Sequence, residues 1–414
     1  MEKNMREYRR LLKYVTFDTM SSETSETAPT TAHQFDLARE LVDEMKAMGI
    51  EDARVDDCCY VYGSIPASSG CEDAPAIGLI SHMDTVPDFS GAHVNPRIIE
   101  NYDGRDIPLG SSGRTIEVRQ FPVLADMKGR TLIVTDGTTV LGADDKAGIA
   151  EILTAAEKIL QENIPHGRIC IAFTPDEEVG HGTDHFDLQA FGADFAYTVD
   201  GNAEGEVVYE NFNAAGAEVT IRGVNVHPGA AKDIMVNAVL TAMEFNSLLP
   251  GAEVPSCTEG REGFFHLLSM QGTVEQAKMQ YIIRDHSRAL FEHRKEEMAM
   301  AAQVLNDRYG EGTVQLVMHD QYYNMVEKIK PHFHLIENAC AAVRDAGLTP
   351  KTFPVRGGTD GAMLSFRGLP CPNLGTGGYA CHGPYEFISA EGMDKSVEII
   401  LGILRRYAKR KRES

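Results

Sequence analysis

The sequence predicts an α/β protein with a mixed, mostly parallel sheet and helices on both faces, interrupted by an inserted α+β domain. The 414 residues are too many for one compact core and suit two domains. Buried strands alternate with a helix between residues 74 and 201, an order typical of parallel sheets. Between residues 215 and 321 the order changes to βαββαβ, which predicts a separate folding unit.

The first half of the chain supplies the strand–helix–strand order. The run "APAIGLISHMD" (74–84) is apolar and ends in polar residues, as a buried strand does when it enters a loop. Short strand-like pieces such as "RTIEVRQFPV" and "RTLIVTDGTTV" between turn residues predict hairpins at 95–140. "GADDKAGIAEILTAAEKIL" (142–160) begins a helix with an apolar face. Two more buried strands are expected at 167–175 and 193–201.

The second half contains the insertion. "AGAEVTIRGV" (215–224) alternates apolar and polar residues, which is typical of a strand with one exposed face. The elements expected after it are a helix at about 230–249, strands at 264–272 and 277–285, a helix at 287–309 and a strand at 313–321. Helices follow at 332–347 and 390–410. We therefore expect a discontinuous α/β domain at residues 1–212 and 323–414, with an inserted domain at 213–322.

Composition excludes several classes of function. The net charge is −22, from 39 basic and 61 acidic residues, which argues against binding to nucleic acid or to anionic membranes. No segment reaches the roughly 18 apolar residues of a membrane helix. The N-terminal "MEKNMREYRRLLKYVTF" indicates an amphipathic helix and lacks the apolar centre of a signal peptide. Eight scattered cysteines without a C-x-x-C pair favour a reduced, cytoplasmic location.

Acidic side chains and a histidine follow the predicted buried strands. The six residues are His82 and Asp84 after the first strand, Asp144 at the start of the helix, Glu177 and Glu178 after the second strand, and Asp200 after the third. In an open α/β sheet, ligands bind beyond the carboxyl ends of the strands. We therefore expect these side chains to share one site. Five of the six are acids, and such a group repels itself unless cations neutralise it.

Two divalent metal ions would balance this charge. Three carboxylates and one hydroxide cancel four positive charges, which leaves the other acids free for hydrogen bonding or proton transfer. Zinc accepts histidine nitrogen and carboxylate oxygen in open sites, and a pair of metals can activate water and polarise a carbonyl group. Adjacent residues of a strand point to opposite sides. One residue of the pair Glu177–Glu178 is therefore expected to hold a metal, while the other takes a proton.

Motifs along the whole chain resemble a known family. "HMDTV", "GADDKAG", "PDEEVGHG", "TVDG" and "CHGPYEF" occur in the order found in the M20 family of dinuclear zinc peptidases. Longer segments, among them "FPVLADMKGRTLIVTDGTTVLGADDKAGIAEIL", "GVNVHPGAAKDIMVNA" and "RGGTDGAMLSFRGLPCPN", resemble the peptidase T family of tripeptide aminopeptidases within it. The resemblance covers residues 5 to 408 and implies a lid or dimerisation-type domain at the insertion.

The resemblance also implies roles for individual residues. It makes five residues the ligands of two zinc ions: His82, Asp144 as the bridge, Glu178, Asp200 and His382. Asp84 would orient His82, and Glu177 would be the general base. Four further residues would contact the substrate: His227 at the oxyanion, and Arg284, Arg356 and Thr359 near the carboxylate. The implied substrate is a short peptide that loses its N-terminal residue, and the implied assembly is a monomer or a homodimer.

Other interpretations of the same residues remain open. Another M20 chemistry, namely a dipeptidase, a carboxypeptidase or an N-acyl amino acid hydrolase, would share the zinc site. An inactive relative could serve as a binding or scaffold protein, although the general base and all five ligands are present. Co²⁺ or Mn²⁺ could replace zinc, because carboxylate-rich sites accept several metals. Ala380, Cys381 and Pro384 depart from the family pattern beside His382, which leaves the width of the substrate pocket open.

Overall fold

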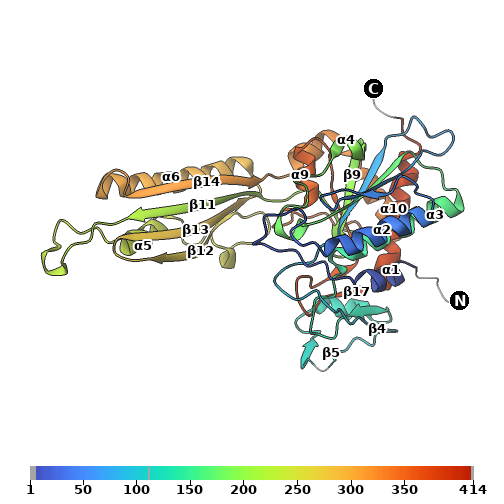
Figure 1. Cartoon of the computed structure of the whole chain (residues 1–414), viewed down its shortest axis with the longest axis horizontal. Helices are drawn as coiled ribbons and strands as arrows, with labels where there is room; N and C mark the ends of the chain where they lie inside the picture. Colours follow the sequence, from blue (N-terminus) through green and yellow to red (C-terminus); the bar gives the residue numbers. More distant parts are fainter. Residues whose placement is uncertain (1–5, 111, 412–414) are drawn as a thin grey trace. The chain divides into compact units, whose positions relative to one another are not determined.

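The structure is a computed structural model that describes residues 6–110 and 112–411. The chain divides into two compact units, whose elements are labelled in Figure 1. Unit 1 comprises Met1–Tyr209, Lys328–Phe353 and Thr359–Ser414, and unit 2 comprises Glu210–Glu327 and Pro354–Gly358. The expected insertion, 213–322, is a few residues shorter at each end and lacks the separate segment 354–358.

A seven-stranded mixed sheet forms the centre of unit 1. Its middle strands β8, β3, β9 and β15 pair in parallel, and antiparallel strands close both edges. The strand order is β1 (Arg54–Val55), β2 (Val61–Ile65), β8 (Ile169–Thr174), β3 (Ile77–His82), β9 (Phe195–Gly201), β15 (Asn373–Gly375) and β10 (Val207–Val208). Every residue of β3 and β8 is buried, which explains their uninterrupted apolar sequences and confirms the predicted parallel sheet.

Helices cover both faces of this sheet, as predicted. Ile80 of β3 packs in a cluster with Phe191 of α4 and Leu364 of α9 on one face. On the other face α3 approaches so closely that a Cβ on its Gly148 would lie 1.9 Å from the Val199 carbonyl oxygen. Only glycine permits this contact, which fixes the start of α3 against the sheet. The helices outside unit 2 are α1 (Arg6–Tyr14), α2 (Gln34–Ala47), α3 (Ala143–Glu162), α4 (Leu188–Phe191), α8 (His334–Asp345), α9 (Asp360–Phe366) and α10 (Ala390–Tyr407).

Short strands beside the main sheet form the predicted hairpins only in part. β4 (Arg97–Ile99), β7 (Leu132–Val134), β16 (Gly378–Tyr379) and β17 (Phe387–Ser389) form one antiparallel sheet, and β5 (Ile107–Leu109) pairs with β6 (Arg114–Ile116). The prediction of a strand through "RTIEVRQFPV" was wrong beyond Ile116, where β6 ends. Residues Pro122–Met127 form a 3-10 helix instead, because proline at its first position has no N–H for a strand ladder.

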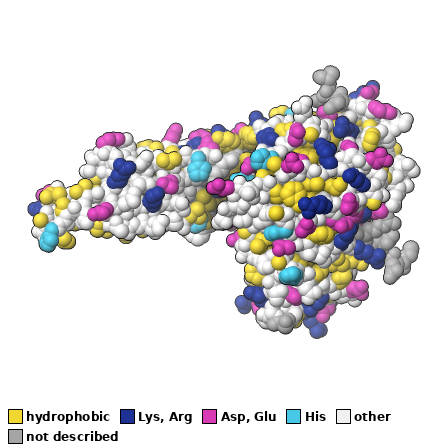
Figure 2. All heavy atoms as spheres, viewed as in Figure 1, with side chains coloured by type: hydrophobic (Ala, Val, Ile, Leu, Met, Phe, Trp, Pro, Cys, Tyr) yellow, Lys and Arg dark blue, Asp and Glu magenta, His cyan; other side chains and the backbone are white. Residues whose placement is uncertain are grey.

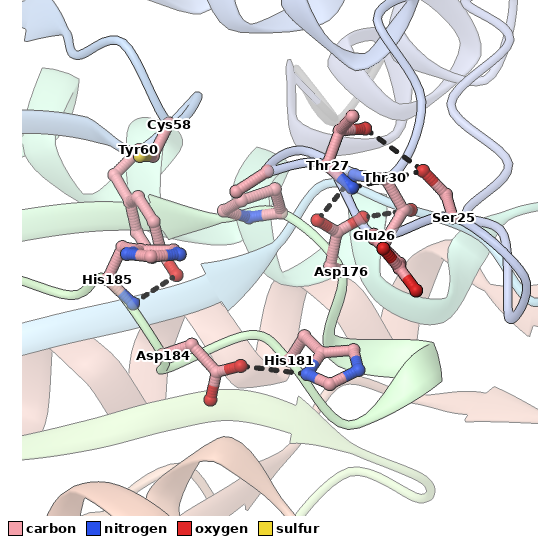
Figure 3. A pocket seen from close by; sticks show the side chains of 12 residues that line it. Ser25, Glu26, Thr27, Thr30, Cys58, Tyr60, Asp176, His181, Asp184 and His185 are labelled. Carbon is pink, nitrogen blue, oxygen red and sulfur yellow. Dashed lines mark hydrogen bonds and ion pairs between the residues drawn. The ribbon is translucent and has the colours of Figure 1, made fainter.

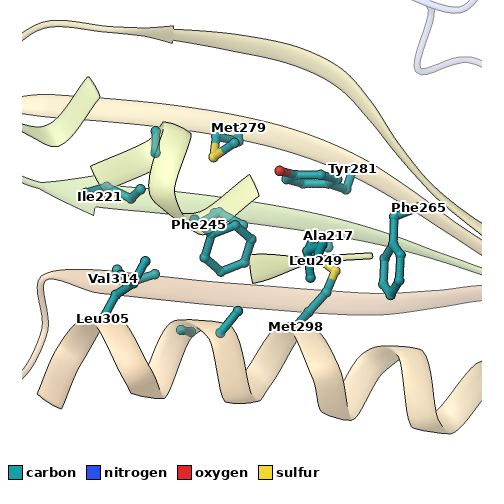
Figure 4. Packing of buried hydrophobic residues seen from close by; sticks show 14 of the residues in the cluster. Ala217, Ile221, Phe245, Leu249, Phe265, Met279, Tyr281, Met298, Leu305 and Val314 are labelled. Carbon is teal, nitrogen blue, oxygen red and sulfur yellow. The ribbon is translucent and has the colours of Figure 1, made fainter. Parts of the chain in front are cut away.

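Unit 2 has the predicted βαββαβ order. Its elements are β11 (Asn213–Arg222), α5 (Ala238–Leu248), β12 (Phe264–Gly272), β13 (Gln276–Asp285), α6 (Arg288–Tyr309) and β14 (Val314–Tyr322), and the sheet order is β12-β13-β11-β14. Figure 4 shows its apolar core, in which Phe245 of α5 and Met298 of α6 face Met279 of the sheet. The alternating burial of β13 therefore separates a face covered by helices from an open face.

Two expected helix boundaries differ. The helix expected from residue 230 begins at Ala238, because the Asn237 side chain accepts hydrogen bonds from the N–H groups of Val239 and Leu240 and caps it there. Residues Pro228–Ala230 form a separate 3-10 turn. The expected N-terminal helix begins at Arg6 in the structure, and its residues 1–5 lie outside the described residues. Further short elements are η4 (Pro255–Cys257), α7 (Val326–Ile329) and η5 (Lys330–His332).

The surface carries both signs of charge. On the face that Figure 2 presents, acidic and basic side chains are interspersed over each unit. The eight cysteines all lie within the described residues and are free. Within residues 6–110 and 112–411, no helix combines the length and the apolar character that a membrane crossing requires.

Candidate metal centre

The carboxyl ends of β3, β8 and β9 meet at one edge of the unit 1 sheet. His82 lies opposite Thr174 in the parallel register of β3 and β8, so Glu177 and Glu178 leave β8 beside His82. Asp200 ends β9, the strand on the other side of β3. The structure thus brings together the strand-end residues that the sequence predicted to share a site.

Asp144 lies between two histidines. Its Oδ1 is 3.0 Å from Nε2 of His82, and its Oδ2 is 3.2 Å from Nε2 of His382. Asp144 adopts non-helical backbone angles within α3, φ −82° and ψ 103°, so its side chain is not restricted to a helical direction. A carboxylate whose two oxygens face different imidazoles has the arrangement of a bridging ligand.

Each imidazole has a second carboxylate neighbour. Nε2 of His82 is 3.6 Å from Oδ1 of Asp200, and Nε2 of His382 is 3.1 Å from Oε2 of Glu178. His82 is buried, whereas the side chain of His382 is 51% exposed. The result is two sets of nitrogen and oxygen atoms that share Asp144: the set at His82 is buried, and the set at His382 is more exposed to solvent.

Electrostatics favour a cation at this position. Burial lowers the pKa of His82, but Asp200 and Asp144 outweigh it and raise the pKa well above its usual value. Burial, and then the charge of Asp144, raise the pKa of Glu178 to about 8. The hydrogen bond to Asp144 is the main cause that raises the pKa of His382 to about 9. These side chains hold protons that a divalent metal ion can replace.

Two groups of described residues have atoms close enough together to hold a metal ion. One is His82, Asp144 and Glu178, and the other is His82, Asp145 and Asp200. The donor atoms are imidazole nitrogen and carboxylate oxygen, which suit zinc and other first-row divalent ions. The residues present therefore fit a metal site.

Asp145 is a possible ligand that the sequence did not single out. Its carboxylate accepts a hydrogen bond from the Ser81 hydroxyl. It also accepts hydrogen bonds from the backbone N–H groups of His82 and Gly148, each at 3.3 Å. These bonds occupy its oxygens, whereas both oxygens of Asp144 face imidazoles. The Asp-Asp dipeptide was visible in the sequence, but only the structure shows which member faces the histidines.

Asp84 is completely buried and holds the turn that carries the two glutamates. Its Oδ1 accepts the N–H of Glu177 at 3.0 Å, and its Oδ2 accepts the N–H of Glu178 at 3.2 Å. Nδ1 of His82 lies 3.0 Å from the backbone oxygen of Asp84 and 3.4 Å from its Oδ1. Asp84 therefore contacts His82 and also positions the glutamate turn, while its role in orienting a metal ligand stays a prediction.

Glu177 is in an environment that favours its protonated form. Burial, and then the negative charge of Asp200, raise the pKa of Glu177 well above its usual value, and His82 opposes this rise. Asp360, buried at the start of α9, also raises the pKa of Glu177. Asp360 lies in "RGGTDG", from which the sequence analysis selected Arg356 and Thr359 but not this aspartate.

Asp176, the third carboxylate of the "PDEE" segment, binds the turn to residues near the N-terminus of the chain. Asp176 accepts hydrogen bonds from the Thr30 N–H at 2.8 Å, the Thr30 hydroxyl at 2.5 Å and the Gln34 amide at 2.7 Å. Figure 3 shows it at a cavity of about 150 Å³ that His181 and Asp184 also line. Asp176 therefore fixes the segment that carries Glu177, and no sequence pattern indicates its distant partners.

The other predicted substrate residues are described within their own units. In unit 2, His227 is exposed and its Nδ1 accepts the Gly229 N–H at 3.1 Å. Burial lowers the pKa of Arg284, which lies over the Tyr322 ring. Arg356 donates to the backbone oxygens of Gly260 and Glu262 and to the Thr258 hydroxyl. In unit 1, the hydroxyl of Thr359 accepts the Ala362 N–H and caps α9.

Comparisons with known proteins show the family of this chain. A family profile described as the peptidase dimerisation domain of the M20 group matches residues 209–313. The peptidase T of Clostridium novyi is 54% identical over 402 residues, which cover 97% of this chain and 98% of that protein. Aminopeptidase PepT of Bacillus cereus has a TM-score of 0.78 at 22% identity and covers 98% of this chain and 99% of its own. A tripeptidase of Staphylococcus aureus has a TM-score of 0.78 at 21% identity, with 99% of each chain covered. The extent of the match to the Clostridium protein shows that this chain is a peptidase of the peptidase T family.

Proposed function

We propose that this protein is a cytoplasmic tripeptide aminopeptidase that uses two zinc ions to release the N-terminal residue of short peptides. The observation that carries the proposal is the position of Asp144, whose two oxygens face His82 and His382. Each histidine also faces another carboxylate, so one shared ligand serves two incomplete sets of donors. Two adjacent metals shared by one carboxylate are an arrangement suited to hydrolysis.

The two sets of donors divide as the distances suggest. His82 and Asp200 would hold one zinc ion, His382 and Glu178 the other, and Asp144 both. When bound, the metals lower the pKa of water and polarise the peptide carbonyl. Co²⁺ or Mn²⁺ could substitute, because the same donors accept them.

The protein groups move the proton. Glu177 takes a proton from the attacking water and delivers it to the amine that leaves. Asp84 keeps Glu177 in place through the backbone bond at 3.0 Å, and His227 donates to the oxyanion.

Selectivity for short peptides requires a cation for the distant carboxylate. Among the described residues of unit 2, Arg284 has no carboxylate partner, and burial lowers its pKa. A half-buried guanidinium without a carboxylate partner suits an anionic ligand. We assign Arg284, with Arg356 and Thr359, to the substrate carboxylate. The guanidinium of Arg356 donates to three acceptors, and that of Arg284 donates to the backbone oxygens of Ala215 and Ile283.

Assembly as a monomer or a homodimer fits unit 2. The match to the peptidase dimerisation domain and the exposed apolar residues Leu240, Met243 and Leu268 support a homodimer through this unit. Light scattering of the purified protein would distinguish the two states.

A ladder of peptides tests the proposed reaction. We expect release of the N-terminal residue from Ala-Ala-Ala, with slower cleavage of the dipeptide and the tetrapeptide and none of N-acetylated Ala-Ala-Ala. Preference for the acetylated peptide would identify an acyl amino acid hydrolase instead. Release of the C-terminal residue would identify a carboxypeptidase, and failure to cleave any member with metal present would favour a binding protein.

A further inference from the structure

A buried carboxylate holds the loop that leads to Asp144. Glu386, just before β17, is 1% exposed. Its Oε2 accepts the backbone N–H groups of Leu141 at 2.7 Å and Gly142 at 2.8 Å. Its Oε1 accepts the N–H of Asp144 itself at 3.0 Å. One side chain therefore binds three backbone donors from a segment more than 240 residues away in the sequence.

These donors have few alternative partners. The first N–H groups of a helix have no acceptor within the helix. Gly142 precedes α3 and has no side chain that could cap it, and Asp144 and Asp145 depart from helical backbone angles. An acceptor from another part of the chain must therefore satisfy this segment. Glu386 supplies it as a carboxylate, whose hydrogen bonds are stronger than those of a neutral acceptor.

The same short segment carries His382. His382 and Glu386 are four residues apart, and Nε2 of His382 lies 3.2 Å from Oδ2 of Asp144. This segment thus contacts Asp144 twice. His382 lies beside the side chain of Asp144, and Glu386 accepts a hydrogen bond from the backbone N–H of Asp144. Any displacement of the loop at 141–144 would change the distance between the two ligands.

We propose that Glu386 is a positioning residue that fixes the backbone of Asp144, so that the two oxygens of Asp144 remain directed at His82 and His382. The inference rests on the proposed metal site. Among the described residues, no hydrogen bond joins Glu386 to His82 or His382, and its three hydrogen bonds all go to the loop at 141–144. Outer groups that orient metal ligands typically change metal affinity by about 10–100-fold when they are removed.

The chain offers a matched control for a purely structural effect. Glu391, at the start of α10, also binds a backbone N–H with its carboxylate: both oxygens accept the N–H of Thr131, at 2.9 and 3.1 Å. This bond holds β7, which carries none of the five predicted ligands. Loss of Glu391 should therefore affect folding without affecting the metal centre.

The test compares Glu386→Ala, Glu386→Gln and Glu391→Ala with the unchanged protein. Metal-free protein is titrated with Co²⁺, whose visible absorption reports affinity and coordination, and melting temperature is recorded without metal. We expect Glu386→Ala to weaken Co²⁺ binding by about 10–100-fold and to alter the spectrum. With saturating metal, kcat for Ala-Ala-Ala should fall more than KM changes. Glu391→Ala should lower the melting temperature but keep the affinity and spectrum of the unchanged protein.

Glu386→Gln keeps the shape and one acceptor oxygen, so it should fold and show a smaller loss of Co²⁺ affinity. If Glu386→Ala does not fold, this variant decides. Co²⁺ affinity and spectrum equal to those of the unchanged protein would overturn the positioning role. Failure of the unchanged protein to bind Co²⁺ would instead overturn the proposed function, so the two failures are distinguishable.

Discussion

Helix α3 contributes to two groups of buried acids with different chemistry. At its start, Asp144 faces the imidazoles of His82 and His382. Further along, Glu151 is completely buried, and neither of its carboxylate oxygens has a hydrogen-bond partner in the described part of the chain. Glu7 of α1 and Asp394 of α10, two helices that also pack together, complete this second group, which we call the helix-junction group.

The difference shows what makes buried acids a metal site. In the described residues, the groups with metal-ligand spacing include Asp144 but none of the helix-junction group, which also lacks an imidazole. Burial, and then the hydrogen bond to Asp394, raise the pKa of Glu7 to about 8. Burial also raises the pKa of Glu151 well above its usual value. Burial favours the protonated forms of Glu7 and Glu151, whereas the converging oxygen and nitrogen atoms at Asp144 suit cations.

The largest expected effect would come from Asp144. Replacing Asp144 with Ala removes the only predicted ligand shared by both sets of donors, so both metals should lose affinity. We expect elemental analysis to find the metal content greatly reduced and hydrolysis of Ala-Ala-Ala to fall below detection. Chelation of the unchanged protein should have the same effect, and added Zn²⁺ should reverse it. Full activity in chelator would show that the acids at Asp144 do not form a catalytic metal site.

Glu177→Ala should separate proton transfer from metal binding. Glu177 is not a predicted ligand, so the metal content should stay the same while kcat falls by about 10²–10⁴-fold. Metal analysis and steady-state kinetics on the same preparation measure both quantities. A parallel loss of metal would instead place Glu177 among the ligands.

The sequence predicted the part of the site that depends on strand order. His82, Glu178 and Asp200 follow apolar runs, and parallel strands bring such ends together. It predicted less where a contact depends on how loops pack. The bonds of Asp176 to Thr30 cross 146 residues without any periodic pattern.

Two further features of the site could not be predicted from the order of strands and helices. A dipeptide alone does not show which of its acids faces a histidine, and the choice of Asp144 over Asp145 came from the resemblance. The roles of His227, Arg284, Arg356 and Thr359 stay predictions, since they depend on a bound substrate. The resemblance to M20 peptidases supplied these residues, and strand periodicity placed His227 and Arg284, but not Arg356, in the unit that contains them.

Because the pKa of Glu7 is raised in the folded protein, the free energy of unfolding should depend on pH. The folded pKa of Glu7, about 8, lies above the ordinary value of 4.5. The folded state therefore binds more protons than the unfolded state between these values. The free energy of unfolding should fall as pH rises from about 4.5 to about 8, by up to roughly 1.4 kcal/mol per pH unit.

Glu7→Gln tests this dependence, because Gln cannot ionise. The groups that face Glu7 are Asp394, Glu151 and Lys158, and the variant leaves them unchanged. Denaturant unfolding should give the variant a smaller loss of stability between pH 5 and pH 8 than the unchanged protein. Curves that run parallel over this range would show that Glu7 titrates normally in the folded protein.

The smallest expected effect on activity is that of Glu151→Gln, which tests the helix-junction group directly. If protons neutralise Glu151, an amide of the same shape replaces a group that is already uncharged. Metal content and kcat/KM for Ala-Ala-Ala should then remain unchanged within error. The free energy of unfolding at pH 8 should rise, by up to roughly 1.4 kcal/mol for each pH unit above the ordinary pKa, since the unfolded variant no longer gains from ionising this side chain. A fall in metal content would mean that Glu151 contributes to the metal centre, and that burial beside α1 and α10 does not separate the two groups.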